Sequence, residues 1–109
     1  MVIDYKSAKF EDFPNFKGGE KKLTASMFFD GKCRMFQGVL ENGASIGLHR
    51  HETSCEMIYV IEGEGNVIIE GKSENVSAGC LHYCPKGAEH TLINSGNNPL
   101  KFIAFIAEQ

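Results

Sequence analysis

The stretch Gly43–Gly63, GASIGLHRHETSCEMIYVIEG, sets the interpretation of the whole chain. It contains His49 and His51 one residue apart, and Glu56 follows five residues later. Alternate side chains of an extended strand point to the same face, so the two imidazoles lie together if this segment is a strand. Two imidazoles that face an apolar sheet repel each other when charged and lose their hydration when neutral. A shared metal ion removes both costs, and Glu56 adds an anionic donor.

A second stretch, Gly79–Asn94, reads GCLHYCPKGAEHTLIN and brings His90 after a Pro-Lys-Gly turn. A single histidine on an apolar face is usually a core residue whose hydrogen bonds are satisfied. Here three of the four histidines fall into one pattern with a carboxylate, which favours a metal site. The predicted ligands are His49, His51, Glu56 and His90. Imidazole with carboxylate suits several divalent transition metals, so the identity of the ion stays open.

Length and composition bound the fold and the classes of partner. The 109 residues suffice for one domain with one core, and 42% of them are hydrophobic. The formal net charge is −3 and the basic residues are scattered, which argues against a nucleic-acid partner. The longest apolar runs, Met57–Ile61 and Phe102–Ala107, are far shorter than the ~20 residues of a membrane helix. No N-terminal stretch resembles a signal peptide, so we expect a soluble, cytoplasmic protein without membrane contact.

Four cysteines are present, Cys33, Cys55, Cys80 and Cys84. Without a secretory signal, a disulfide framework is not expected. Cys80 and Cys84 lie four residues apart in a predicted strand, hence ~13 Å apart, which is too far for a disulfide. We therefore expect buried, reduced thiols.

From Leu23 onward, short apolar runs alternate with glycine, asparagine and proline, which predicts β-strands throughout. The predicted strands cover residues 23–29, 33–40, 45–51, 56–61, 66–70, 73–76, 81–84, 90–93 and 100–106. Residues 2–5 are a further candidate strand, whereas residues 11–19 suggest an irregular segment. Many short strands without helical periodicity are typical of a sandwich or barrel. The predicted organisation is a lead-in over residues 1–22 and one all-β barrel domain over residues 23–109.

With these residues in view, the chain resembles the cupin superfamily, and in particular its small single-domain members. The first cupin motif, G-x5-H-x-H-x3–4-E-x6-G, and the second, G-x5-P-x-G-x2-H-x3-N, both match at every specified position. The matching residues are Gly43, His49, His51, Glu56 and Gly63 for the first motif, and Gly79, Pro85, Gly87, His90 and Asn94 for the second. The resemblance extends loosely over residues 23–107. Two small departures are Glu52, where proline often follows the second histidine, and Cys80, where an acidic residue is common.

The resemblance implies a jelly-roll barrel that holds one divalent metal, such as iron, manganese, zinc or nickel. The ligands would be His49, His51, Glu56 and His90, with open positions for water or substrate. It also implies a homodimer, for which residues 2–10 offer a strand that could pair across a two-fold axis. The motifs are specific for fold and metal site but not for a reaction.

Two function hypotheses follow from the resemblance and the predicted ligands. The first is a small metalloenzyme, an isomerase, lyase or dioxygenase, that acts on a small polar metabolite. Adjacent oxygen atoms chelate such a metal, which favours sugar-derived or keto-acid-like substrates. The alternative is a non-catalytic protein that binds or senses a small ligand with the same barrel and metal. A purely structural role has no need of four converging donors.

Other polar residues receive weaker assignments from the sequence. Arg50 lies between two inward ligands and should point outward to a surface ion pair. His82 should also point outward, because its larger neighbours Leu81 and Tyr83 are expected to face the core. Asn94 is expected to stabilise a turn rather than to bind metal.

Some residues have positions that the sequence leaves open. Three residues of a neighbouring strand are candidates for lining the pocket, although their register is not fixed: Arg34, Met35 and Gln37. Four phenylalanines are expected in the core or in a dimer interface: Phe28, Phe29, Phe102 and Phe105.

Overall fold

Ten strands and one 3₁₀ turn make up the chain in this computed structural model, which describes residues 1–109. The elements are β1 Glu11–Pro14, η1 Phe16–Gly18, β2 Lys22–Phe29, β3 Cys33–Leu40, β4 Ser45–Arg50, β5 Ser54–Glu62, β6 Glu64–Ile69, β7 Lys72–Ser77, β8 Leu81–Cys84, β9 Glu89–Ile93 and β10 Leu100–Glu108. The predicted all-β architecture is confirmed, and each strand predicted from residue 23 onward has a counterpart.

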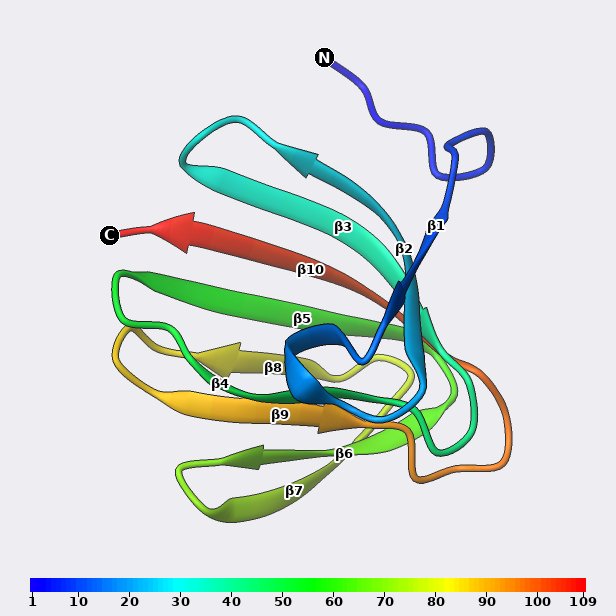
Figure 1. Cartoon of the computed structure of the whole chain (residues 1–109), viewed down its shortest axis with the longest axis vertical. Coiled ribbons are helices and arrows are strands. Elements are labelled where there is room, and N and C mark those ends of the chain that lie inside the picture. Colours follow the sequence, from blue (N-terminus) through cyan, green and yellow to red (C-terminus); the bar gives the residue numbers. More distant parts are fainter.

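The strands form two antiparallel sheets with the orders β1-β2-β3-β10-β5-β8 and β4-β9-β6-β7. Most neighbours within a sheet are distant in sequence: β10 lies between β3 and β5, and β9 lies between β4 and β6. Figure 1 shows the six-stranded sheet passing from β2 through β10 to β8, with β4, β9, β6 and β7 forming the lower half. This arrangement is the predicted jelly-roll barrel.

The core lies between the two sheets. Fourteen buried hydrophobic residues form one cluster, with Phe36 and Phe102 from the larger sheet and Ile46, Val67 and Leu92 from the smaller one. The rings of Phe36 and Phe102 meet edge to face with centroids 5.9 Å apart, a favourable geometry for an aromatic pair. Contact between the inner faces of both sheets closes the barrel.

The register of the larger sheet places two rows of side chains on its inner face. One row consists of residues paired across four strands: Arg34, Ile106, Glu56 and Cys84. The next inward row, two residues further along each strand, consists of Phe36, Ala104, Ile58 and His82. Because side chains alternate between faces, the intervening row that contains Met35 and Tyr83 points outward.

The N-terminal segment departs from the prediction. Residues 1–10 contain no strand, whereas β1 lies within the segment that was predicted to be irregular and pairs with β2 of the same chain. Asp12 explains part of this pairing, since its carboxylate accepts hydrogen bonds from Lys22 Nζ and Thr24 Oγ1. Phe13 also holds β1 in place, because its ring packs edge to face on the ring of Phe16 with centroids 5.8 Å apart. Pro14 is tolerated because β1 is an edge strand.

The four cysteines are all free. The expectation of buried thiols is correct for Cys55 and Cys84, but Cys33 is exposed and Cys80 is half-buried. Cys33 is exposed because it begins β3 directly after the Asp30-Gly31 turn. The structure contains no helix with the length and apolar character that a membrane span requires.

Candidate metal centre

The structure brings together the four predicted ligands at one end of the barrel. His49 lies on β4, His51 directly follows β4, Glu56 lies on β5 and His90 lies on β9, so both sheets contribute. His49 and His90 are direct partners in the β4–β9 register. One donor atom from each of the four residues lies within 4.8 Å of the others, a grouping that could hold a metal ion.

The separations between the donor atoms fit a shared ion. Glu56 Oε1 lies 2.8 Å from His51 Nε2 and 2.7 Å from His90 Nε2. His51 Nε2 lies 3.1 Å from the Nε2 atoms of both His49 and His90. Ligands at adjacent corners of an octahedron with bonds of about 2.1 Å are about 3.0 Å apart. His49 is the more distant donor from the carboxylate, with its Nε2 3.8 Å from Glu56 Oε1.

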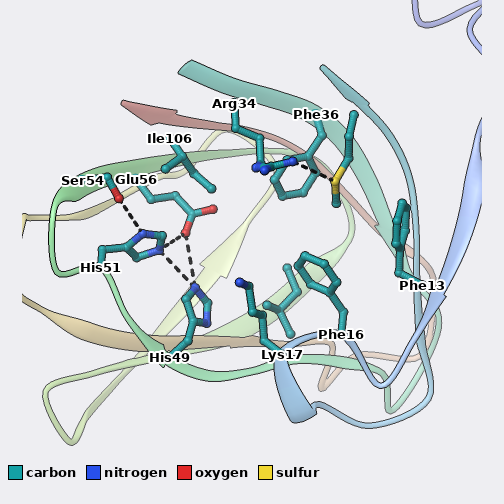
Figure 2. A pocket seen from close by; sticks show the side chains of 12 residues that line it. Phe13, Phe16, Lys17, Arg34, Phe36, His49, His51, Ser54, Glu56 and Ile106 are labelled. Atoms are coloured by element: carbon teal, nitrogen blue, oxygen red, sulfur yellow. Dashed lines mark hydrogen bonds and ion pairs between the residues drawn. The ribbon is translucent and has the colours of Figure 1, made fainter. Parts of the chain in front are cut away.

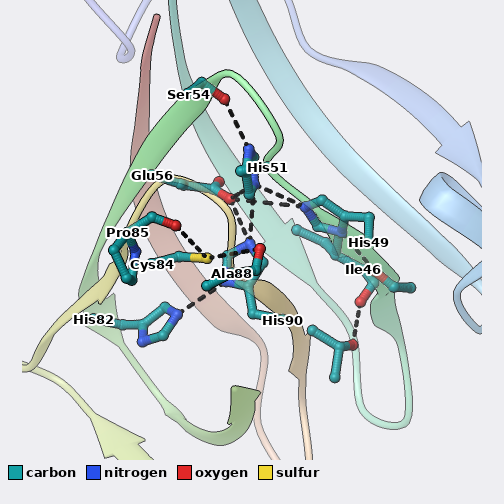
Figure 3. A network of polar contacts seen from close by, with 12 residues as sticks. Ile46, His49, His51, Ser54, Glu56, His82, Cys84, Pro85, Ala88 and His90 are labelled. Carbon is teal, nitrogen blue, oxygen red and sulfur yellow. Dashed lines mark hydrogen bonds and ion pairs between the residues drawn. The ribbon is translucent and has the colours of Figure 1, made fainter. Parts of the chain in front are cut away.

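The outer nitrogen of each imidazole also has a partner. The Nδ1 contacts are 2.7 Å for His49 to the Gly47 carbonyl oxygen, 3.1 Å for His51 to Ser54 Oγ and 2.9 Å for His90 to His82 Nε2. Metal-binding histidines usually donate this second N–H to an acceptor that fixes the ring orientation. With every Nδ1 engaged on the outside, the three Nε2 atoms face Glu56 and each other (Figure 3).

Glu56 supplies the negative charge of the site although its side chain is only 4% exposed. Burial by itself would raise the pKa of Glu56, but the adjacent imidazoles of His49, His51 and His90 hold that pKa well below its usual value. The carboxylate is therefore ionised, and a buried anion among imidazoles is a suitable ligand for a divalent cation. Burial raises the pKa of the neighbouring Cys84 thiol to about 11, so this side chain stays a neutral thiol.

A cavity of about 390 Å³ opens beside three of the four predicted ligands, His49, His51 and Glu56. Twelve residues line it: Phe13, Phe16, Lys17, Met27, Arg34, Phe36, Ile46, His49, His51, Ser54, Glu56 and Ile106. In Figure 2 His49, His51 and Glu56 lie on one side of this space, and Lys17 and Arg34 point into it. Three phenylalanines lie on the other side: Phe13, Phe16 and Phe36. The cavity has the size and mixed lining of a small-molecule site.

Arg34 and Lys17 bring two positive charges to this cavity without an acidic partner in the chain. Arg34 lies in the same inward row as Glu56, and its guanidinium rests 4.5 Å from the ring centroid of Phe29. Lys17 Nζ lies 5.7 Å from the ring centroid of Phe16. Cations held by aromatic rings rather than carboxylates remain available to an anionic ligand.

Lys17 reaches the cavity because the backbone of η1 packs closely against that of β4. A Cβ atom on Gly47 would lie 2.0 Å from the Lys17 carbonyl oxygen, and one on Gly19 would lie 2.0 Å from the Ser45 carbonyl oxygen. Only glycine allows η1 to lie this close to β4, the strand that carries His49. Lys17 itself adopts a left-handed conformation with φ of 55°, which is uncommon for a residue with a side chain.

His82 contradicts the sequence prediction. It was expected to point outward, but it is 7% exposed and contacts His90, whereas Leu81 and Tyr83 are 64% and 52% exposed. Burial lowers the pKa of His82, as does His90, so the ring is neutral. The sizes of Leu81 and Tyr83 predicted the wrong orientation for His82. Its inward orientation follows from the strand register and from its hydrogen bond with His90. The pairing of Cys84 with Glu56 places His82 on the same inner face, and residue size and alternation do not reveal this long-range register.

The other assignments have mixed outcomes. Arg50 is exposed and forms the predicted surface ion pair, with Nη1 3.6 Å from Glu70 Oε1. Asn94 is fully buried and stabilises a turn, since Nδ2 donates to the carbonyl oxygen of Asn98 and Oδ1 accepts from the Gly96 N–H. Of the three pocket candidates, only Arg34 lines the cavity. Met35 and Gln37 lie on the outward face of β3.

The four phenylalanines also differ in their surroundings. Phe102 belongs to the core, and Phe28 is half-buried. Phe29 and Phe105 are more exposed, and the ring of Phe29 lies against the guanidinium of Arg34.

Comparison with known proteins agrees with this geometry. Residues 36–106 match the family model described as a cupin domain. An oxalate-binding protein of Thermotoga maritima is 32% identical over 112 residues, covering 97% of this chain and 93% of that protein. A crystal structure of a predicted oxalate decarboxylase from Thermotoga maritima superposes with a TM-score of 0.94 at 30% identity over the full length of both chains.

A more distant structure shows the fold alone. An RmlC-like cupin from Shewanella frigidimarina has a TM-score of 0.80 at 20% identity and covers 99% of this chain and 90% of its own. The family model spans well over half of the sequence, and the motif residues converge on one site as described above. The chain is therefore a member of the cupin family.

Proposed function

We propose that this cupin binds one divalent transition metal through His49, His51, Glu56 and His90 and uses it to hold a small anionic metabolite. The observation that carries the proposal is the convergence of three Nε2 atoms and one ionised carboxylate at separations that a shared ion would impose. The Nδ1 contacts support it, because they leave Nε2 as the coordinating atom of every ring. Iron, manganese, zinc and nickel all suit this donor set.

The charges around the cavity favour a ligand with carboxylate groups. A divalent ion balanced by Glu56 alone keeps a net positive charge, and Lys17 and Arg34 add two more at the same cavity. Small dicarboxylates and 2-oxo acids present adjacent oxygen atoms for chelation and a negative charge for the two cations. A neutral sugar would leave both cations uncompensated. The name of the oxalate-binding relative, which describes that protein, is consistent with this class.

For catalysis, a bound metal would supply Lewis acidity, or redox chemistry if it is iron or manganese. The chain would orient the ligand through Lys17 and Arg34 and exclude water with Phe16, Phe36 and Ile106, which line the cavity. We propose on this basis a metal-dependent enzyme acting on a small keto-acid-like or dicarboxylate metabolite.

A second candidate is a protein that binds or senses the same ligand without converting it. One observation favours it. The ionisable side chains that line the cavity are three predicted ligands, Arg34 and Lys17, so Lys17 is the single candidate for an acid or base. A reaction that needs a separate acid and base would find only one such group.

Metal-free protein, prepared with a chelator, and protein loaded anaerobically with Mn²⁺, Fe²⁺ or Zn²⁺ test both candidates. We expect oxalate and 2-oxo acids to raise the melting temperature of the loaded protein only, and neutral sugars to have no effect. Release of formate or carbon dioxide, or consumption of oxygen, would identify an enzyme. Stabilisation without turnover would identify the binding protein. Equal stabilisation of metal-free and loaded protein by oxalate would contradict the proposed role of the metal.

We further propose a homodimer formed through the outward face of the larger sheet. Large apolar side chains are exposed together on β5, β8 and β10: Tyr59, Ile61, Leu81, Tyr83 and Phe105. The β5–β8 register places Tyr59 directly beside Leu81. A contiguous apolar patch of this kind is typical of an interface. Light scattering should give twice the chain mass for the wild type and a smaller mass for Leu81→Lys, and a monomeric wild type at micromolar concentration would contradict this.

A further inference from the structure

His82 is the one histidine outside the predicted ligand set, and it touches a ligand directly. Its Nε2 lies 2.9 Å from His90 Nδ1 (Figure 3). The ring centroids are 5.2 Å apart and the planes differ by 27°. The distance between the centroids is close to the sum of the Nε2–Nδ1 distance and the two ring radii. The two rings therefore meet edge to edge, near a common plane. This geometry is a hydrogen bond between the two imidazoles rather than face-to-face packing.

The two imidazoles join the two sheets. His82 lies on β8, at the edge of the six-stranded sheet, and pairs in register with Ile58, whereas His90 lies on β9 of the other sheet. His82 is 7% exposed and His90 is 1% exposed. The far side of His82 lines a separate cavity of about 280 Å³ together with Glu74 and Asn75. This cavity gives the second nitrogen of His82 access to water while Nε2 faces His90.

Metal binding at His90 demands a particular arrangement of hydrogens. Nε2 faces the other donors and must carry no hydrogen when it coordinates, so the ring hydrogen of neutral His90 lies on Nδ1. A buried N–H needs an acceptor, and the acceptor within reach is His82 Nε2. The other two ligand rings use Gly47 O and Ser54 Oγ for the same purpose.

We propose that His82 is a positioning residue that accepts the Nδ1–H of His90 and thereby fixes the tautomer and orientation in which His90 binds metal. This inference rests on the proposed metal site but concerns a residue outside the ligand set, at an unspecified position of the second cupin motif. His82 acts through His90 and needs no contact with the ion or the metabolite.

Two substitutions at one position separate hydrogen bonding from space filling. His82→Leu fills much of the volume without an acceptor, whereas His82→Gln offers a side-chain oxygen near the position of the lost Nε2. We expect His82→Leu to lower Zn²⁺ affinity by roughly 10- to 100-fold, the range for outer partners of ligand histidines. His82→Gln should restore most of that loss. Tyr83→Leu, on the same strand but 52% exposed, is the matched control and should bind Zn²⁺ like the wild type.

The measurement is competition for Zn²⁺ against a chromogenic chelator, made on variants whose circular dichroism shows a folded barrel. Unchanged affinity in His82→Leu, or an equal loss in His82→Gln, would overturn the role of His82 while the metal site stands. A wild type that binds no Zn²⁺ would overturn the metal site and this inference together.

A readout on the unmodified protein keeps the inference testable if His82→Leu does not fold. Nitrogen-15 NMR of the Zn²⁺-loaded wild type distinguishes protonated from unprotonated ring nitrogens. We expect a hydrogen on Nδ1 of His90 and none on Nε2 of His82. A hydrogen on His82 Nε2 in the loaded protein would show that His82 donates rather than accepts, which contradicts the proposal.

Discussion

The two ends of the barrel interior are built from the same strands but have opposite chemistry. Along β5 the inward side chains change from Glu56 to Ile58 and Val60, and along β9 they change from His90 to Leu92. At one end ionisable groups converge beside a cavity, and at the other end buried aliphatic and aromatic side chains fill the space. Within one strand, a predicted ligand and a core residue are therefore only two positions apart, as Glu56 and Ile58 are on β5.

This separation means that the ligand end can change without loss of the fold. The apolar end contributes burial, which drives folding, whereas the ligand end buries a carboxylate and three imidazoles. The four predicted ligands contact one another, and no buried side-chain nitrogen or oxygen lacks a partner. We therefore expect the barrel to fold without an ion, and we expect substitutions at the two ends to have different consequences.

The largest effect is expected at the apolar end. Phe102 is fully buried against Phe36, so Phe102→Ala removes that contact and leaves a cavity. We expect the free energy of unfolding to fall by about 3–5 kcal/mol in chemical denaturation. Leu48→Ala on β4 is the control and should cost much less, since Leu48 is 58% exposed. Equal losses for the two variants would contradict the placement of the core.

At the ligand end, Glu56→Gln removes the one negative charge while nearly preserving shape. We expect Zn²⁺ affinity to fall more than about 100-fold, beyond the usual effect of changing an outer partner. Circular dichroism of the metal-free variant should still show a folded barrel. Arg50→Ala is the control, because Arg50 lies between two predicted ligands but is exposed and pairs with Glu70. Wild-type affinity in Glu56→Gln would exclude this carboxylate as a ligand.

Substitution of Arg34 should change ligand binding without changing metal binding. Arg34 lines the cavity but is not among the four donors, so Arg34→Ala should retain the ion. We expect binding of oxalate to the loaded protein to weaken by roughly 10- to 100-fold, the range for one hydrogen bond to a charged group. Calorimetric titration measures this loss. If oxalate binds the variant as tightly as the wild type, the ligand lies elsewhere in the cavity.

The smallest effect concerns the stability of the metal-free chain at acid pH. The pKa of Glu56 lies below its usual value because the imidazoles of His49, His51 and His90 surround its carboxylate. A depressed pKa stabilises the fold at pH above the unfolded value, and the stabilisation is lost as the pH falls from there toward the folded pKa. Denaturation of metal-free protein between about pH 6 and pH 3 should therefore show a steeper loss in the wild type than in Glu56→Gln. Parallel curves would contradict the charged state assigned to Glu56.

The predicted ligands could be identified from the sequence because they stand in two short motifs. The i, i+2 spacing of His49 and His51 and the two motifs identify residues that the fold brings together. The strands from residue 23 onward were also predictable, since turn residues separate them. The role of His82 was not predictable from size and alternation, because it depends on which residue of β5 faces β8.

The N-terminal segment shows the same limit. Lys17 reaches the cavity through a close approach of η1 to β4 that glycines permit, and no local pattern in the sequence indicates that approach. Likewise β1 is a strand because of its partner β2 rather than its own composition. Long-range register, rather than residue type, decides these features.

The most direct test of the central claim is the metal content of purified protein by elemental analysis. The protein would first be dialysed against a low concentration of Zn²⁺ or Mn²⁺. Our account predicts one divalent ion per chain in the wild type and almost none in the double variant His51→Ala/His90→Ala, with both proteins folded by circular dichroism. One ion per chain in the folded double variant would show that the converging donors are not the metal site.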